Sequence, residues 1–175
     1  MKSKTYILSL LIAFSSYSFA CDCAIMKLSE LQKSSYEYSD CIFIGEIVEI
    51  DNANYSFTIK VIESLDGGDK PGNLYVVKQE SSCDIFTDKK EKWLVYADSH
   101  DEGFITMDMC ALNRSFEKPL TRTITLPPMP VNTLTESERE VIAKKKWDSL
   151  IHREKKILEK EIEILREKRD GNASI

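Results

Sequence analysis

The sequence predicts a mainly β domain, a small antiparallel barrel or sandwich, followed by a long C-terminal α-helix. Between Cys41 and Cys110 the chain is a succession of short apolar or alternating segments separated by turn residues. No helical period of apolar residues interrupts these segments, which favours an all-β core. After a proline-rich segment, residues 135–169 contain neither glycine nor proline, as is typical of one uninterrupted helix.

The first twenty residues have the form of a secretory signal peptide. Two lysines give a basic start, residues 6–14 are an apolar run, and small residues occupy the −3 and −1 positions before Cys21. The apolar run is shorter than the ~20 residues that cross a bilayer as a helix. We therefore predict that residues 1–20 are a signal peptide, that the protein is secreted or periplasmic, and that Cys21 is its first mature residue.

A lipoprotein is the alternative to release. In bacteria, a cysteine directly after the cleavage site is the residue that receives lipid, and Cys21 has this position. Ser18 and Phe19 differ from the aliphatic and small residues that usually precede a lipidated cysteine. Contact with a membrane is expected only if Cys21 is lipidated.

Five cysteines are present, at positions 21, 23, 41, 83 and 110. Disulfides are the ordinary use of cysteine in an exported chain, and two bridges would leave one thiol over. The sequence alone fixes no connectivity. The histidines, His100 and His152, have no metal-ligand spacing with each other or with a cysteine pair. We expect no intrinsic metal site and no cofactor.

Charge is shared unevenly along the mature chain. Residues 21–134 hold 19 acidic and 11 basic side chains, and residues 135–175 hold 10 and 11. Nucleic-acid binding requires a basic face, so the acidic first part argues against it. Together the two parts are long enough for one core of ordinary size.

The predicted elements follow in order. A helix is expected near residues 28–33, ahead of the first strand. That strand, residues 41–50, is mostly apolar, and Gly45 lies where a strand bends or carries a bulge. The next strand alternates apolar and polar side chains from Tyr55 to Val61. Three further strands are expected at residues 74–79, 93–98 and 104–110.

Prolines prevent regular structure in residues 119–134, which we predict as a stiff linker. Thr135 and Glu138 then have the spacing of a capping box, so the predicted helix covers residues 135–170, with a frayed tail at 171–175. Apolar pairs recur every seven residues, at Leu150-Ile151, Ile157-Leu158 and Ile164-Leu165.

This repeat predicts an amphipathic helix roughly 50 Å long, of which a small barrel covers only a part. Two arrangements are open for residues 135–170. The helix packs along its own barrel, or it pairs with a second copy as a coiled coil and makes a homodimer.

Four motifs in order carry a resemblance to a known family. They are Cys21-Asp22-Cys23 at the cleavage site, Ser39-Asp40 leading into a strand with Phe43-x-Gly45, Cys83 ahead of the strand at 93–97, and Met109-Cys110 at a strand end. Together they resemble the netrin module and the tissue inhibitors of metalloproteinases over roughly residues 21–118. The resemblance implies a five-stranded barrel of the OB type.

The resemblance also implies two bridges, Cys21 to Cys83 and Cys23 to Cys110, which fasten the N-terminus to the barrel at adjacent points. Cys41 has no partner in that scheme. It is either a buried free thiol or an intermolecular link, and the buried thiol fits the apolar character of free cysteine.

In the inhibitors that this chain resembles, the amine and carbonyl of the first cysteine chelate the protease zinc, and the next residue enters the specificity pocket. These roles would fall to Cys21 and Asp22. An α-amino group with a pKa of about 7.7–8.0 has an appreciable neutral fraction near neutral pH. Asp22 departs from the family pattern, because the inhibitors carry a small hydroxyl or similar residue there.

Two functions are therefore expected. The first is a secreted metalloprotease inhibitor, whose partner is a zinc metalloprotease contacted by Cys21 and Asp22. The second is a non-inhibitory exported or envelope-attached protein-binding module that self-associates through its C-terminal helix. An enzyme is not expected, because the sequence has no Ser-His-Asp set, HExxH motif or phosphate loop.

Overall fold

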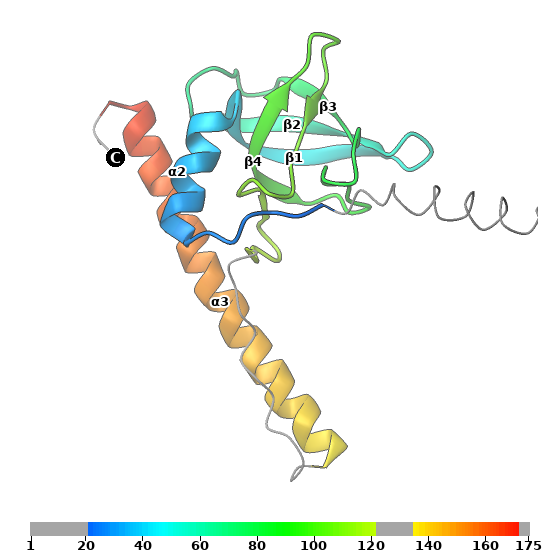
Figure 1. The fold of residues 1–175 in the computed structure, drawn as a ribbon, viewed down its shortest axis with the longest axis vertical. Coiled ribbons are helices and arrows are strands. Elements are labelled where there is room, and N and C mark those ends of the chain that lie inside the picture. The colour runs from blue at the N-terminus through cyan, green and yellow to red at the C-terminus, as the bar shows by residue number, and fades with distance from the viewer. Residues whose placement is uncertain (1–20, 122–134, 172–175) are drawn as a thin grey trace, which may run out of the picture.

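The computed structural model describes residues 21–121 and 135–171 of the 175-residue chain. It has a mainly β domain followed by one long helix, which confirms the predicted fold class (Figure 1). The predicted signal peptide at 1–20, residues 122–134 of the predicted linker and residues 172–175 of the predicted tail lie outside the described residues. No helix in the described ranges is long and apolar enough to cross a membrane.

Five strands close into a barrel of the OB type. In chain order, the described elements are α2 (Leu28–Tyr38), β1 (Cys41–Asp51), β2 (Ser56–Ser64), β3 (Leu74–Lys78), β4 (Lys92–Ser99), β5 (Ile105–Thr106), β6 (Arg114–Ser115) and α3 (Glu136–Arg169). Strands pair in the order β1-β2-β3-β5-β4, and β4 pairs back to β1, which closes the barrel. The β3–β5 pair is parallel, the other pairs are antiparallel, and β6 extends the sheet beyond β4.

Gly45 allows β1 to bend over the barrel interior, as the sequence predicts. The β1–β2 register shifts between Ile44 and Gly45. A Cβ atom added at Gly45 would lie 2.7 Å from the side chain of Ile59 and 2.9 Å from that of Phe43. Both side chains belong to the fully buried core inside the barrel, so no side chain fits at this position.

Strand β2 alternates as expected, but it begins later. Phe57, Ile59 and Val61 are all buried inside the barrel. Tyr55 was expected on the same face, and this prediction is wrong: its side chain is 60% exposed and its φ of 47° places it in the turn before the strand. The left-handed backbone of a tight turn ends the alternation there.

The last predicted strand, residues 104–110, is much shorter in the structure. Only Ile105 and Thr106 form strand β5. The chain then turns, because the carboxylate of Asp108 accepts a hydrogen bond from the backbone N–H of Cys110 at 2.6 Å. Such local side-chain acceptors compete with ladder pairing. The two-residue strand β6 was not predicted at all.

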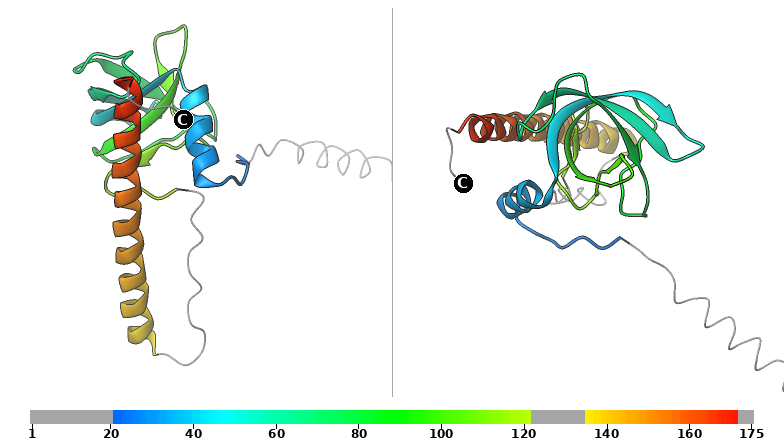
Figure 2. Two further views of the ribbon diagram at one scale, coloured as in Figure 1. Left: turned by 90° about the vertical axis from the view of Figure 1, so that its left-hand side faces the viewer. Right: turned by 90° about the horizontal axis from the view of Figure 1, so that it is seen from above.

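Helix α2 is longer than the predicted stretch of residues 28–33. It lies outside the barrel wall and next to α3, as both views of Figure 2 show, and packs against the same buried residues of β1 and β4 that α3 contacts. Buried Ser35 accepts a hydrogen bond from the backbone N–H of Leu112 at 2.9 Å. The ammonium of Lys168 on α3 lies 3.6 Å from the centre of the Tyr36 ring, a cation–π contact between the helices.

Helix α3 begins at the predicted capping box. The backbone N–H of Glu138 donates to Oγ1 of Thr135 at 3.4 Å, and the Glu138 carboxylate accepts from the backbone N–H of Thr135 at 2.8 Å. The helix has 34 residues, hence a length of about 50 Å. Its N-terminal half projects away from the barrel (Figures 1 and 2).

The C-terminal half of α3 packs on the outer surface of β1 and β4. The apolar residues of this second core are Ile42, Ile44, Leu65, Leu94, Tyr96, Leu112, Leu158, Ile162 and Leu165. Of the predicted apolar pairs, Leu158 and Leu165 are buried, whereas Ile164 is 40% exposed. The packing of α3 along its own barrel is therefore observed for this half of the helix.

Candidate functional site

Two disulfides fasten the N-terminal segment to the barrel. Cys21 is bonded to Cys83 and Cys23 to Cys110, with Cα–Cα distances of 5.2 and 5.4 Å. These are the pairs that the resemblance implies. Each bridge closes a long loop, with sequence separations of 62 and 87, and constrains the unfolded chain by about 4 kcal/mol in the chain-entropy description.

The two bridges lie next to each other. The sulfur atoms of Cys21 and Cys110 are 3.8 Å apart although they belong to different disulfides. The anchoring loops are joined by a backbone hydrogen bond of 2.8 Å from Met109 to the carbonyl of Cys83. Sulfur atoms of Cys21, Cys23 and Cys110 lie within 4.8 Å of one another, but disulfide sulfur is not the thiolate that a metal ion requires.

Residues 21–27, which include the anchoring Cys21 and Cys23, have no regular secondary structure ahead of α2. The Asp22 side chain is exposed between the two bonded cysteines, and Cys21 itself is half-buried. Ile25 is fully exposed, at 103% of its reference area. The predicted contact residues therefore form a fixed, outward-facing edge.

A cavity of about 340 Å³ lies between this edge and the barrel. Its walls come from the N-terminal segment, α2, the end of β4 and the turn after β5. The lining residues are Asp22, Cys23, Ala24, Met26, Leu31, Ser34, Ser35, Tyr38, Ser39, Asp98, Asp108, Cys110 and Ala111. The set contains three aspartates and no lysine, arginine or histidine.

Negative charge is crowded at the β4 side of the cavity. Partial burial raises the pKa of Asp98 above its usual value, and the charges of Asp40 and Asp108 raise it further, while His100 lowers it. The carboxylate of Asp40 accepts hydrogen bonds from the backbone N–H and the hydroxyl of Ser99, at 2.9 and 3.1 Å. The cavity thus has an acidic wall without a lining cation.

Cys41 is a buried free thiol, the first of the two expected alternatives. Its sulfur lies 3.7 Å from the carbonyl oxygen of Ala97. Burial raises the pKa of this thiol to about 12, and the nearby carboxylates of Asp69 and Asp66 add to the effect. A raised pKa favours the protonated thiol over the thiolate, which is the reactive form.

A second set of polar residues fixes α3 to the barrel, and the sequence did not reveal it. Arg114 on β6 is 1% exposed and contacts the carboxylate of Glu161 on α3. The same carboxylate accepts from the hydroxyl of Tyr96 at 2.5 Å and from the side-chain amide of Gln32 at 3.2 Å. Burial lowers the pKa of Arg114 to about 10, and electrostatic interactions with Tyr96 and Glu154 partly offset this effect.

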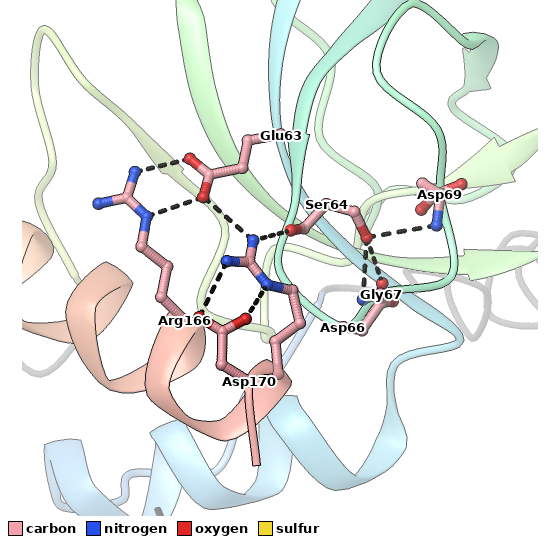
Figure 3. Close-up of polar contacts among 8 residues, drawn as sticks. Glu63, Ser64, Asp66, Gly67, Asp69, Arg166 and Asp170 are labelled. Carbon is pink, nitrogen blue, oxygen red and sulfur yellow. Dashed lines mark hydrogen bonds and ion pairs between the residues drawn. The ribbon is translucent and has the colours of Figure 1, made fainter. Parts of the chain in front are cut away.

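A partly exposed cluster, shown in Figure 3, holds the last turn of α3 against the end of β2. Arg166 donates two hydrogen bonds to the carboxylate of Glu63, at 2.8 and 2.6 Å. Arg169 donates to the same carboxylate at 3.2 Å and to the carbonyl of Ser64 at 2.8 Å. The hydrogen bonds from Arg166 are the main reason that the pKa of Glu63 lies below its usual value.

Arg114, Glu161 and the cavity residues Asp98 and Asp108 carry no signal in the sequence. Arg114 follows a turn and lies in a two-residue strand, and Glu161 resembles its exposed neighbours on a charged helix. Glu161 could have been identified only if the side of α3 that packs on the barrel had been known, because a carboxylate on that side must be buried.

No family model and no curated protein matches this sequence. The arrangement at the N-terminus, with its two bridges, its exposed aspartate and its acidic cavity, is therefore interpreted from its own chemistry.

Proposed function

We propose that the chain is an exported inhibitor of a zinc metalloprotease and that it engages the protease through Cys21 and Asp22. The supporting observation is that disulfides hold the chain on both sides of Asp22 and leave this side chain exposed. A segment fixed before binding loses little conformational entropy in a cleft, which favours tight association.

The ligands for the protease zinc would be the α-amino nitrogen and the carbonyl oxygen of Cys21. A catalytic zinc keeps one position for water or substrate, and this chelate would displace the water. Metal binding draws the amine to its neutral form, because the ligand must be deprotonated. The mechanism requires cleavage after Ala20, since a preceding residue would turn the amine into an amide.

The proposed location is consistent with the cysteine chemistry. Two disulfides indicate a compartment outside the reducing cytoplasm. The proposal includes export by residues 1–20 and release as a soluble inhibitor. It also includes a relationship to the netrin module and the tissue inhibitors of metalloproteinases, which the sequence resembles.

The test compares two forms of the protein, one that begins at Cys21 and one with a single added alanine before it. The inhibition constant is measured against the catalytic domain of a matrix-type zinc metalloprotease. We expect the added alanine to raise it at least about 100-fold, or 2.7 kcal/mol, with both disulfides retained. Equal inhibition by the two forms would contradict zinc chelation, and no inhibition by the form that begins at Cys21 would contradict the proposed function.

A second candidate function is self-association through α3 by a non-inhibitory binding module. The N-terminal half of this helix projects from the barrel, with Val141 69% exposed and Trp147 38% exposed (Figure 1). Large aromatic side chains are enriched at protein interfaces. The partner would be a second copy of the chain, along the helix that the sequence predicts as a coiled coil.

Sedimentation equilibrium tests the second candidate function, because it measures the mass of the protein in solution as a function of concentration. Truncation after Pro130 would also remove Leu158 and its neighbours from the core, so substitution is the cleaner change. We expect a concentration-dependent dimer that is lost in the double variant Val141→Glu and Trp147→Glu. A full-length protein that stays monomeric at all concentrations would contradict the second candidate.

A further inference from the structure

We propose that the cavity beside Asp22 binds one basic side chain, a lysine or an arginine, of a partner polypeptide. This contact needs no metal ion and none of the zinc-chelating atoms of Cys21, so it can hold or fail apart from the zinc chelation proposed above, although Asp22 belongs to both surfaces. The N-terminal segment and α2 contribute most of the residues that line this cavity.

The cavity is large enough to admit a lysine or arginine side chain. Its volume of about 340 Å³ lies near the lower end of the ~300–1,000 Å³ that small-molecule sites occupy. Met26, Leu31 and Tyr38 supply apolar wall. Lysine and arginine side chains pack an apolar stem against such walls and place a charged group at the end.

The charge of the cavity selects a cation. Asp22, Asp98 and Asp108 line it, and no basic residue does. The carboxylates of Asp40 and Asp108 already disfavour the charged form of Asp98. An ammonium or guanidinium group would relieve this repulsion and form charge-assisted hydrogen bonds.

The carboxylates of Asp98 and Asp108 can accept hydrogen bonds from an ammonium or guanidinium group. One oxygen of Asp108 accepts the backbone N–H of Cys110, and the carboxylate has further lone pairs. Within residues 21–121 and 135–171, no hydrogen bond is made to the side chain of Asp98. A bound cation would thus meet carboxylate oxygens that can still accept hydrogen bonds.

Exposed apolar side chains lie next to the cavity and could contact apolar residues on either side of the partner's basic residue. Ile25 lies between two lining residues and is 103% exposed, and Tyr38 on the wall is 79% exposed. Exposed apolar groups beside a polar pocket are typical of protein-binding surfaces. The occupant is therefore a peptide segment with a basic side chain between apolar ones, attracted by the excess of acidic residues in 21–134.

Amide NMR titration of the protein that begins at Cys21 tests the inference without any protease. The probe is the blocked tripeptide Leu-Arg-Leu, and the matched control is Leu-citrulline-Leu, which has nearly the same shape but no charge. We expect saturable shifts at the amides of Ser34, Ser39 and Ala111 in the millimolar range. The citrulline peptide should bind at least about fivefold more weakly, because charged hydrogen bonds are roughly twice as strong as neutral ones.

Two charge-neutralising variants locate the site. Asp98→Asn should weaken binding of the arginine peptide about threefold, as expected for one partly solvated ion pair. Asp88→Asn removes an equal charge from an exposed residue outside the cavity and should leave binding unchanged. The inference is overturned by the absence of saturable shifts at the cavity amides, by equal binding of the two peptides, or by equal effects of the two variants.

Discussion

Asp22 places a negative charge on the exposed edge between the two disulfides. In the proposed complex this carboxylate enters a protease pocket beside a catalytic glutamate, and two like charges that lose water together cost affinity. We expect Asp22→Ser to lower the inhibition constant about tenfold, or 1.4 kcal/mol. Asp88→Asn is the control for net charge. An inhibition constant that stays unchanged or rises in Asp22→Ser would contradict the placement of Asp22 in the pocket.

Gly45 leaves room for the side chains of the barrel core, and Gly68, which has no such close neighbours, serves as the control position. A Cβ atom at Gly45 meets the Ile59 side chain at 2.7 Å, whereas one at Gly68 meets only an Asp66 oxygen at 3.5 Å. We expect Gly45→Ala to lower the free energy of unfolding by about 2 kcal/mol, as overpacked cores do. Gly68→Ala should change it by less than about 0.5 kcal/mol. Urea unfolding with both disulfides intact measures the difference, and equal effects would count against the close packing at Gly45.

At the scale of elements, the buried contact between Glu161 and Arg114 holds α3 on the barrel. Removal of Glu161 takes away the carboxylate that contacts the 1% exposed guanidinium and leaves Glu154 as the nearby negative charge. We expect Glu161→Ala to lower the free energy of unfolding by about 3 kcal/mol or more. Glu159→Ala, at an exposed position of the same helix, should have an effect below about 0.5 kcal/mol. Similar losses in the two variants would show that the buried pair does not stabilise α3.

The cluster at the end of α3 makes stability depend on pH. Hydrogen bonds from Arg166 and Arg169 lower the pKa of Glu63 in the folded protein below its ordinary value of 4.5. Its stabilisation is fully present above pH 4.5 and is lost as the pH falls through the lowered pKa, because the unfolded chain binds the proton first. We expect Glu63→Gln to reduce stability at about pH 7 more than at about pH 3. A loss that is the same at both values, measured by urea unfolding, would contradict this linkage.

The long elements could be predicted because their patterns repeat. Alternation over residues 57–61 identified β2, and the capping box at Thr135 identified the start of α3. Strands β5 and β6 have two residues each, which is too short for any period. The seven-residue repeat of α3 identified its apolar residues but not its packed face, since Ile164 is exposed and Glu161 is buried.

The candidate site was predictable only in its covalent part. Both cysteines of the N-terminal triplet have the partners that the resemblance implies. The cavity combines Asp22, α2, Asp98 and Asp108, which are far apart in the chain and meet only after the barrel has closed. No sequence motif indicates that these residues are close in space, so the acidic cavity could be identified only from the structure.

At the scale of the whole molecule, the barrel and the C-terminal half of α3 share one core. Leu158, Ile162 and Leu165 pack on the barrel strands, so part of α3 and the barrel bury their apolar side chains against each other. The opposite end of α3 extends away from the barrel (Figure 2). The two surfaces proposed for partners, the disulfide-anchored N-terminal edge and the projecting half of α3, are therefore separate in the molecule.

The proposed inhibition depends on a mature protein that begins with a free amine at Cys21, held by a bridge to Cys83 and, through Cys23, by a second bridge to Cys110. Mass spectrometry of the exported protein, as intact mass and as peptides mapped without reduction, tests this claim most directly. We expect a chain of residues 21–175 that has lost four hydrogens, carries an unmodified amine and keeps Cys41 as its free thiol. A lipid on Cys21, a retained N-terminal extension or a different pairing of the cysteines would contradict it.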